Sequence, residues 1–264
     1  MLLPPPSHQP PAPWGWALWG ALTGLLLVLL LGAPVQWLTA GVTQAAQGRV
    51  QLLQPRGTVW QGSAQLALAG GLGSQDIALL PGRLNWRLHI SAWALQVDLL
   101  AECCMQQPWR LSLTPGWGSL RLTLADSQSQ WPAAVLAGLG TPWNTVQPQG
   151  QLGLSTQGLA LVWSRGRLGV DGSAGLDAQQ MSSRLSTLKP MGSYRLALQG
   201  GVAPGFTLQT LEGALQLSGS GQWVGGRLRF EGVATAAPDR LDALANLLNI
   251  LGQRDGARAI IKVG

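Results

Sequence analysis

The sequence predicts a mainly β protein: a single N-terminal transmembrane helix, then an antiparallel, curved β-sheet domain with two short covering helices. Three observations support this fold class. Residues 1–48 contain no Asp, Glu, Lys or Arg, and Trp14 to Ala33 is almost continuously apolar. Much of the remaining chain alternates apolar and polar residues with period two, which is typical of strands with one dry and one wet face. Two segments break this alternation with helical patterns.

The apolar segment 14–33 is long enough to cross a bilayer as a helix. Its 20 residues, at about 1.5 Å of rise each, give roughly 30 Å, the thickness of a hydrocarbon core. Tryptophans stand near both ends, and indole rings favour the headgroup region. Pro34 cannot continue the helix without losing a hydrogen bond, so the helix is expected to end near Gly32 or Ala33.

A cleaved signal peptide is the competing interpretation, with small-residue processing sites at 38–40 or 44–46. The apolar run exceeds the usual signal-peptide core of about 7 to 15 residues, and no Lys or Arg precedes it. An uncleaved anchor is therefore favoured. The proline-rich residues 1–13 are predicted to form a short disordered, extended arm, and 34–48 a linker. Because no basic residue precedes the run, charge alone does not give its orientation.

The remaining residues, 49–264, carry all the charged side chains, 17 basic and 11 acidic. Charged residues make up 11% of the chain, about half the usual fraction of roughly 25%. The polar surface must therefore come from Gln, Ser, Thr and Gly. The net charge of +6 is carried by arginines that are scattered singly, without a nucleic-acid-binding motif, so we expect no nucleic acid partner.

Alternation predicts roughly ten to twelve strands, separated by glycine- or proline-containing turns such as 80–82 and 114–116. The clearest strand alternates apolar residues at 84, 86, 88 and 90 with polar neighbours. The same pattern recurs at Leu111 and Leu113; Leu120, Leu122 and Leu124; Leu152 and Leu154; Leu159, Leu161 and Trp163; Leu168 and Val170; Tyr194, Leu196 and Leu198; Leu215 and Leu217; and Leu228 and Phe230. One wet and one dry face indicate antiparallel pairing.

Two short helices are predicted within this domain, and a final strand at 259–263. Residues 131–139 begin with Pro132 at a favourable first helical position and end before a glycine. Residues 239–251 place leucines 241, 244, 248 and 251 on one stripe, and Gly252 ends them. Such a stripe most often covers the dry face of a sheet.

Three segments that begin at Trp60, Trp163 and Trp223 share a tryptophan followed by glycine and then leucine. Each has the pattern of a hairpin that closes on a glycine turn. This weak internal repeat indicates two similar halves of the domain, about 49–147 and 148–264.

The residues offer little for catalysis. His8 lies in the proline-rich arm, and His89 falls on the polar face of a predicted strand. The nearest carboxylate pairs are Asp98 with Glu102 and Asp171 with Asp177, and each flanks a turn or a strand end. Nucleophile elbows and phosphate-binding loops are absent from the sequence. We therefore predict that the chain is not an enzyme and has no catalytic residue, no cofactor-binding residue and no cofactor.

Cys103 and Cys104 are the only cysteines and are neighbours in the chain. They either form a vicinal disulfide in an oxidising compartment or pack as two thiols. Neither arrangement supplies metal-ligand spacing, so no metal site is predicted. The 13 tryptophans are explained mostly by the membrane region and by packing, so no small-molecule substrate is expected.

Five local signatures follow the apolar segment in order. They are Gly57 to Ala64 (GTVWQGSA), Leu80 to Trp86 (LPGRLNW), Gly192 to Leu196 (GSYRL), Leu211 to Leu215 (LEGAL) and Phe230 to Ala234 (FEGVA). Their order and spacing resemble the protein N component of the bacterial type II secretion system, over nearly the whole chain.

This resemblance implies a single-pass protein of the cell inner membrane, with a cytoplasmic N-terminus and a periplasmic β-rich domain. Its expected role is to assist export of folded proteins across the outer membrane, through contacts with other inner-membrane subunits and with membrane lipid. The chain departs from the expected pattern because no basic residue precedes the apolar segment. The alternative function is that of a periplasmic, lipid-handling β-groove similar to the AsmA-type proteins.

Overall fold

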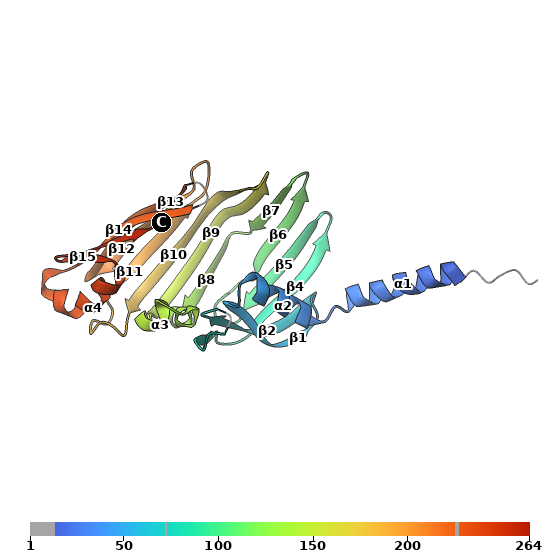
Figure 1. Cartoon of the computed structure of the whole chain (residues 1–264), viewed down its shortest axis with the longest axis horizontal. Helices are drawn as coiled ribbons and strands as arrows, with labels where there is room; N and C mark the ends of the chain where they lie inside the picture. The colour runs from blue at the N-terminus through green and yellow to red at the C-terminus, as the bar shows by residue number, and fades with distance from the viewer. Residues whose placement is uncertain (1–13, 72, 225–226) are drawn as a thin grey trace, which may run out of the picture.

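The computed structural model describes residues 14–71, 73–224 and 227–264 (Figure 1). The predicted cytoplasmic arm, with His8, lies outside the described residues. Sixteen strands, all paired antiparallel, form one sheet. The central part of the predicted fold class is therefore confirmed, because the chain is mainly β and is built on one curved, open antiparallel sheet.

Most neighbouring strands in the sheet are consecutive in the chain, so most of them are joined as hairpins. The strands are β1 (Val50–Gly57), β2 (Gln61–Ala69), β3 (Ile77–Leu79), β4 (Leu84–Ser91), β5 (Ala94–Ala101), β6 (Trp109–Gly116), β7 (Ser119–Leu124), β8 (Ser127–Pro132), β9 (Gln149–Ser164), β10 (Arg167–Ser182), β11 (Gly192–Gln199), β12 (Gly205–Gly213), β13 (Leu215–Val224), β14 (Arg227–Ala236), β15 (Gln253–Asp255) and β16 (Arg258–Val263). Their order is β1-β2-β4-β5-β6-β7-β9-β10-β11-β12-β13-β14-β16-β15, with β3 paired to β2 and β8 to β9.

The predicted span at 14–33 coincides with helix α1 (Trp14–Leu31), which extends away from the sheet (Figure 1). Its 18 residues cover about 27 Å, slightly less than the thickness of a typical hydrocarbon core. Among the described residues, no helix combines the length and the apolar character that a membrane crossing needs. The transmembrane part of the fold prediction is therefore not supported by these helices.

More helical segments cover the sheet than the two that were predicted. They are α2 (Val35–Ala45), the 3-10 helix η1 (Ala133–Leu139), α3 (Trp143–Val146), the 3-10 helix η2 (Pro238–Arg240) and α4 (Leu241–Leu251). The predicted helices correspond to η1 and to η2 with α4. Pro132, expected at the start of a helix, instead ends strand β8 and precedes η1.

Helix α2 occupies the segment that was assigned as a linker. Its Val35 side chain is buried against Ala64 of β2 and Trp86 of β4. This packing makes α2 part of the folded domain, which therefore begins before Arg49.

Three clusters of buried side chains form the core along the dry face of the sheet, each beneath a covering helix. The first lies under α2, the second under η1, and the third under α4. In the third cluster Leu244 and Leu248 of α4 are fully buried against Leu215 and Ala234. The leucine stripe predicted for this helix therefore covers the dry face as expected.

The sheet continues through the predicted boundary between the two halves. Strand β9 begins at Gln149 and pairs with β7 and β8 on one side and with β10 on the other. The internal similarity of the halves stays a prediction.

Candidate interaction surface

One face of the sheet is polar over its whole width, and we call it the polar face. Because Trp86 points toward α2, its neighbours Asn85 and Arg87 point to the opposite side of the sheet. The strand register places Arg87 opposite Asp98, and Asp98 opposite Arg110. It continues with Asp177 opposite Arg195 on β10 and β11, and with Glu231 opposite Lys262 on β14 and β16.

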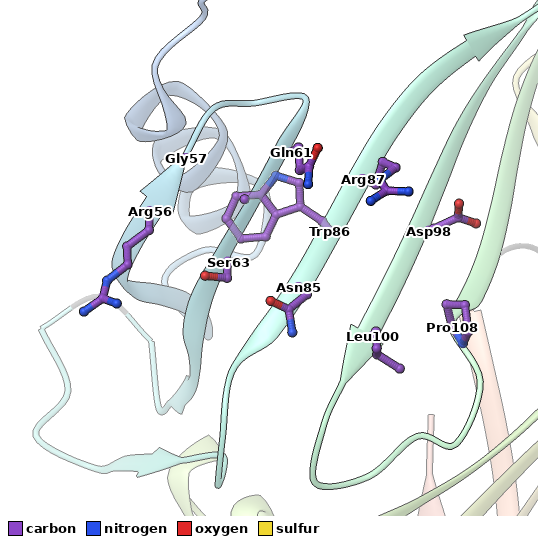
Figure 2. A pocket seen from close by; sticks show the side chains of 11 residues that line it. Arg56, Gly57, Gln61, Ser63, Asn85, Trp86, Arg87, Asp98, Leu100 and Pro108 are labelled. Carbon is purple, nitrogen blue, oxygen red and sulfur yellow. The ribbon is translucent and has the colours of Figure 1, made fainter.

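A hollow of about 760 Å³ lies on the polar face at the N-terminal end of the sheet. Figure 2 shows that its lining comes from four adjacent strands and a following loop: Arg56 of β1, Gln61 and Ser63 of β2, Asn85, Trp86 and Arg87 of β4, Asp98 and Leu100 of β5, and Pro108. Most of these groups are hydrogen-bond donors or acceptors. The hollow therefore suits a polar partner surface better than an apolar ligand.

A tight turn between β1 and β2 shapes the floor of this hollow. Gln61 donates its backbone N–H to the Thr58 hydroxyl, at 3.2 Å. The Trp86 indole donates to the carbonyls of Thr58 and Val59, at 3.3 and 3.1 Å. A Cβ at Gly62 would meet the Trp86 ring and the carbonyl oxygen of Arg56. The GTVWQGSA signature is thus a structural turn that holds the Trp86 side chain.

Arg83, which directly precedes strand β4, stabilises the same region. Its guanidinium donates to the carbonyls of Gln54 and Ser63 and to the Ser63 hydroxyl, at 2.8, 2.9 and 3.1 Å. Gln54 has a positive φ of 46°, at a bulge where the register of β1 against β2 shifts. Arg83 therefore stabilises an irregular edge strand that the alternation pattern does not predict.

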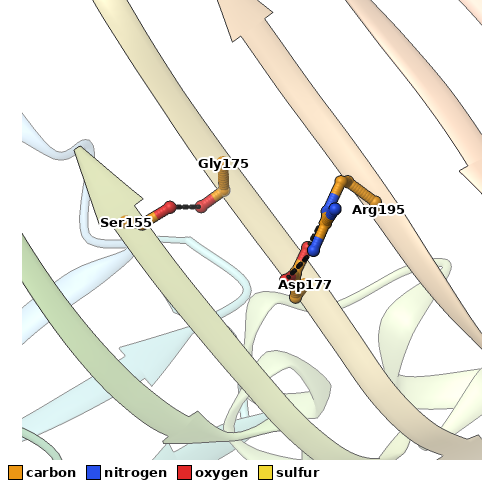
Figure 3. A network of polar contacts seen from close by, with 4 residues as sticks. All are labelled: Ser155, Gly175, Asp177 and Arg195. Atoms are coloured by element: carbon orange, nitrogen blue, oxygen red, sulfur yellow. Dashed lines mark hydrogen bonds and ion pairs between the residues drawn. The ribbon is translucent and has the colours of Figure 1, made fainter. Parts of the chain in front are cut away.

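A second polar network lies at the centre of the polar face (Figure 3). Arg195 donates from Nε and from a terminal nitrogen to the two carboxylate oxygens of Asp177, at 2.6 and 2.7 Å. These hydrogen bonds, with the positive charge, hold the pKa of Asp177 below its ordinary value. Beside it, a hollow of about 440 Å³ is lined by polar residues that include Glu102, Gln128 and Gln179.

Each carboxylate that the sequence offers for catalysis has a polar partner here. Asp98 pairs with Arg110 at 3.3 Å, and Glu102 accepts a hydrogen bond from Asn85 at 3.1 Å. Asp171 lies 3.7 Å from Arg121, and Asp177 is held by Arg195 as described above. The Asp177 carboxylate is held as an anion by its arginine partner, through two hydrogen bonds to Arg195.

His89 and the two cysteines occupy separate places in the fold. His89 Nε2 lies 2.7 Å from Oε1 of Gln96 on the next strand. Cys103 and Cys104 form the vicinal disulfide, one of the two states that the sequence left open. Over residues 14–71, 73–224 and 227–264, no group of three or more His, Cys, Asp or Glu side chains is arranged to hold a metal ion.

Nothing in the sequence indicated that Asp98, considered there as a carboxylate, and the signature residues Ser63 and Asn85 line one hollow. Arg56 is an ordinary polar residue in a strand, and Ser63 and Asn85 fall within two of the family signatures, which do not indicate a hollow. The usable signal was their alternation with apolar residues on adjacent strands, together with the GTVWQGSA turn.

The fold and this surface define a single-sheet β protein whose broad polar face is hollowed at several places. The family described as Type II secretion system (T2SS), protein N matches residues 48–261. The match covers most of the chain, so the chain belongs to this family, as the five signatures indicated. Membership connects it to protein transport and implies interaction with other type II secretion components. No curated protein and no solved structure matches the chain.

Proposed function

We propose that this chain is an accessory, non-enzymatic component of the type II secretion machinery at the cell inner membrane. In this proposal the N-terminus is cytoplasmic and the β-rich domain is periplasmic. The domain assists export of folded proteins by binding another inner-membrane subunit through its polar face. The observation that carries the proposal is the family match over residues 48–261, combined with a polar face rich in hydrogen-bonding groups.

The large hollow is the part of the polar face best suited to a partner. Arg56 and Arg87 are exposed at its rim, and Asn85 and Ser63 present an amide and a hydroxyl inside it. Arginine is enriched in protein interfaces because its planar fork binds carboxylates and carbonyls in fixed directions. A partner loop with acidic or carbonyl groups would satisfy this set.

Membrane attachment is supported by the character of α1 and the residues around it. Trp14, Leu27 and Leu31 are 75%, 52% and 73% exposed, and no charged residue occurs before Arg49. An apolar helix with such uncovered side chains is stable only in apolar surroundings. The apolar run continues through Gly32 and Ala33, and a slightly short segment is accommodated by local thinning of the bilayer. The Cys103–Cys104 disulfide is consistent with an oxidising compartment such as the periplasm.

The test is deletion followed by complementation, with secretion of exported proteins as the readout. Full-length protein should restore secretion and co-purify with another inner-membrane subunit of the system. Arg56→Ala combined with Arg87→Ala should lose co-purification, whereas Arg184→Ala should retain it. Arg184 is a matched control because it is an exposed arginine in the connection between β10 and β11, away from the hollow. Normal secretion in the deletion strain, with no subunit captured, would contradict the proposal.

Lipid handling is a second candidate function, favoured by apolar side chains on the dry face beyond the covering helices. Leu120 and Leu168 remain exposed there, and Leu122 and Leu161 are half-buried. Five described hollows, however, are lined mainly by polar residues. Mass spectrometry of the purified protein separates the two functions, because lipid handling requires bound phospholipid in stoichiometric amount.

A further inference from the structure

Four described turns project from one end of the strands. They join β4 to β5, β6 to β7, β9 to β10 and β11 to β12. The end of β13 and the start of β14 lie at the same edge of the sheet, and we call this edge the hairpin edge. Because consecutive strands run antiparallel, these turns all lie at the same edge of the sheet. Helices α3 and α4 lie at the opposite edge (Figure 1).

Large apolar side chains stand uncovered on the hairpin edge. Trp93 and Trp117 occupy the tips of the β4–β5 and β6–β7 turns and are 87% and 106% exposed. Val202, in the β11–β12 turn, is 107% exposed. Trp163, next to the β9–β10 turn, and Trp223, near the end of β13, are also exposed. The four described turns and the end of β13 therefore each present a tryptophan or a branched apolar side chain to the surroundings.

The charges beside these side chains are all positive. Five sequence segments of nine residues cover these places and contain five arginines and no Asp or Glu: segments 88–96, 113–121, 162–170, 198–206 and 221–229, with Arg121, Arg165, Arg167, Arg227 and Arg229. Arg121 contacts Asp171, which lies just outside these segments. Elsewhere on the polar face arginines alternate with carboxylates. The hairpin edge therefore differs from the rest of this face in the sign of its charge and in its exposed apolar side chains.

The apolar helix joins the domain on the same side. The β1–β2 turn also points toward the hairpin edge, because β1 and β2 continue the antiparallel order. In that turn Val59 donates its N–H to the carbonyl of Ala33, at 3.0 Å, and Pro34 forms a β-bridge with Thr58. Helix α1 is therefore connected at the β1–β2 turn and leaves the domain past β1 (Figure 1). We take the hairpin edge, on the side of this turn, as the edge that faces a bilayer holding α1. This step rests on the proposed membrane attachment.

We propose that the hairpin edge binds the surface of an anionic phospholipid bilayer. Indole rings partition to the headgroup level, where the ring is covered and the N–H stays hydrated. Arginines beside them pair with lipid phosphates, and each basic residue held near an anionic leaflet raises binding about fivefold. The combination of exposed tryptophan and arginine at this edge matches an anionic bilayer surface in both apolar and charged character.

The test uses the full chain in vesicles, with a single fluorescent label on each edge. Ser91→Cys places a thiol two residues from Trp93, and Gln107→Cys places one in the exposed turn at the opposite edge. The native cysteines are joined to each other, so the new thiol is the reactive one. The vesicles contain phosphatidylcholine with phosphatidylglycerol and a spin-labelled phospholipid that quenches nearby fluorophores.

The label at Ser91→Cys should be quenched at least about twofold more strongly than the label at Gln107→Cys, since only the hairpin edge contacts lipid. Vesicles without phosphatidylglycerol, or high salt, should reduce this difference. Trp93→Ser with Trp117→Ser should abolish it; both side chains are exposed, so the fold is retained. Protein that floats with vesicles but shows equal quenching at both edges contradicts the inference while leaving the membrane anchor intact. Protein that does not float contradicts both.

Discussion

Asp177 and Arg195 face each other across β10 and β11 and form a bidentate ion pair, with nitrogen to oxygen distances of 2.6 and 2.7 Å. The pair lies at the centre of the polar face, midway along the sheet. Both side chains are partly exposed, so the pair contributes modestly to stability while supporting the register of β10 against β11.

Asp177→Asn should lower the melting temperature by at most about 2 °C at pH 7, because solvent screens an exposed pair. Arg195 depresses the pKa of Asp177 in the folded state, so the stabilisation is present above the ordinary carboxyl pKa. It is lost as pH falls through the folded-state pKa, so the difference between variant and native protein should shrink below the ordinary carboxyl pKa and vanish at pH values below the folded-state pKa. Calorimetric melts at several pH values measure this. A difference that persists at low pH would rule out ionisation as its source.

Gly62→Ala should destabilise the protein by about 1–3 kcal/mol, since the added methyl group meets the Trp86 ring and the Arg56 carbonyl. Gly169→Ala is the matched control, because a Cβ there has an ordinary contact of 3.7 Å with the Val162 carbonyl. Urea unfolding of both variants provides the comparison. Equal stability of the two would show that the turn does not hold Trp86 as described.

Leu248→Ala in α4 should cost about 2–5 kcal/mol, because the side chain is fully buried in the core cluster beneath that helix. Ile250 lies on the same helix but is 43% exposed. Ile250→Ala should therefore cost much less, since little apolar surface is lost. Chemical denaturation measures both, and similar losses would mean that α4 does not lie on the sheet through its leucine stripe.

Tyr194→Phe should leave stability unchanged or raise it at neutral pH. The Tyr194 hydroxyl is buried without a hydrogen-bond partner among the described residues, and such burial costs about 1–3 kcal/mol. Burial also raises the pKa of this hydroxyl, so native stability should fall as pH rises above about 10, where the unfolded chain loses its proton. The Tyr194→Phe variant should lack this one contribution to the fall of stability at high pH. A clear loss of stability at pH 7 would reveal a partner for the hydroxyl.

Much of the sheet was predictable because its residues alternate strictly. Within the row at 84, 86, 88 and 90, Trp86 is only 3% exposed and faces the core as predicted, whereas Ile90 at the strand end is 69% exposed. Alternation fails in β1, where Gln54 adopts a positive φ at a bulge, and in the short strands β3 and β15. Helix α2 was missed because its apolar face is short and the segment follows a proline, so its packing against Trp86 decides its structure.

The candidate interaction surface was less predictable than the fold. Asn85 and Arg87 were assigned correctly to a wet face, but only the pairing of four strands brings them together with Arg56 and Asp98. Likewise, the alternation that marks Asp177 as polar does not reveal that Arg195 lies opposite. Long-range register, which depends on turn lengths and bulges, sets these neighbours.

The most direct test of the central claim is site-specific crosslinking in cells that carry the complete secretion system. A photo-crosslinking amino acid in place of Arg87 should capture another inner-membrane subunit, because Arg87 lies at the rim of the large hollow. The same replacement at Arg184, an exposed position outside the hollow, should capture none. Capture of the same subunit with equal yield at both positions, or at neither, would contradict a docking role for this hollow.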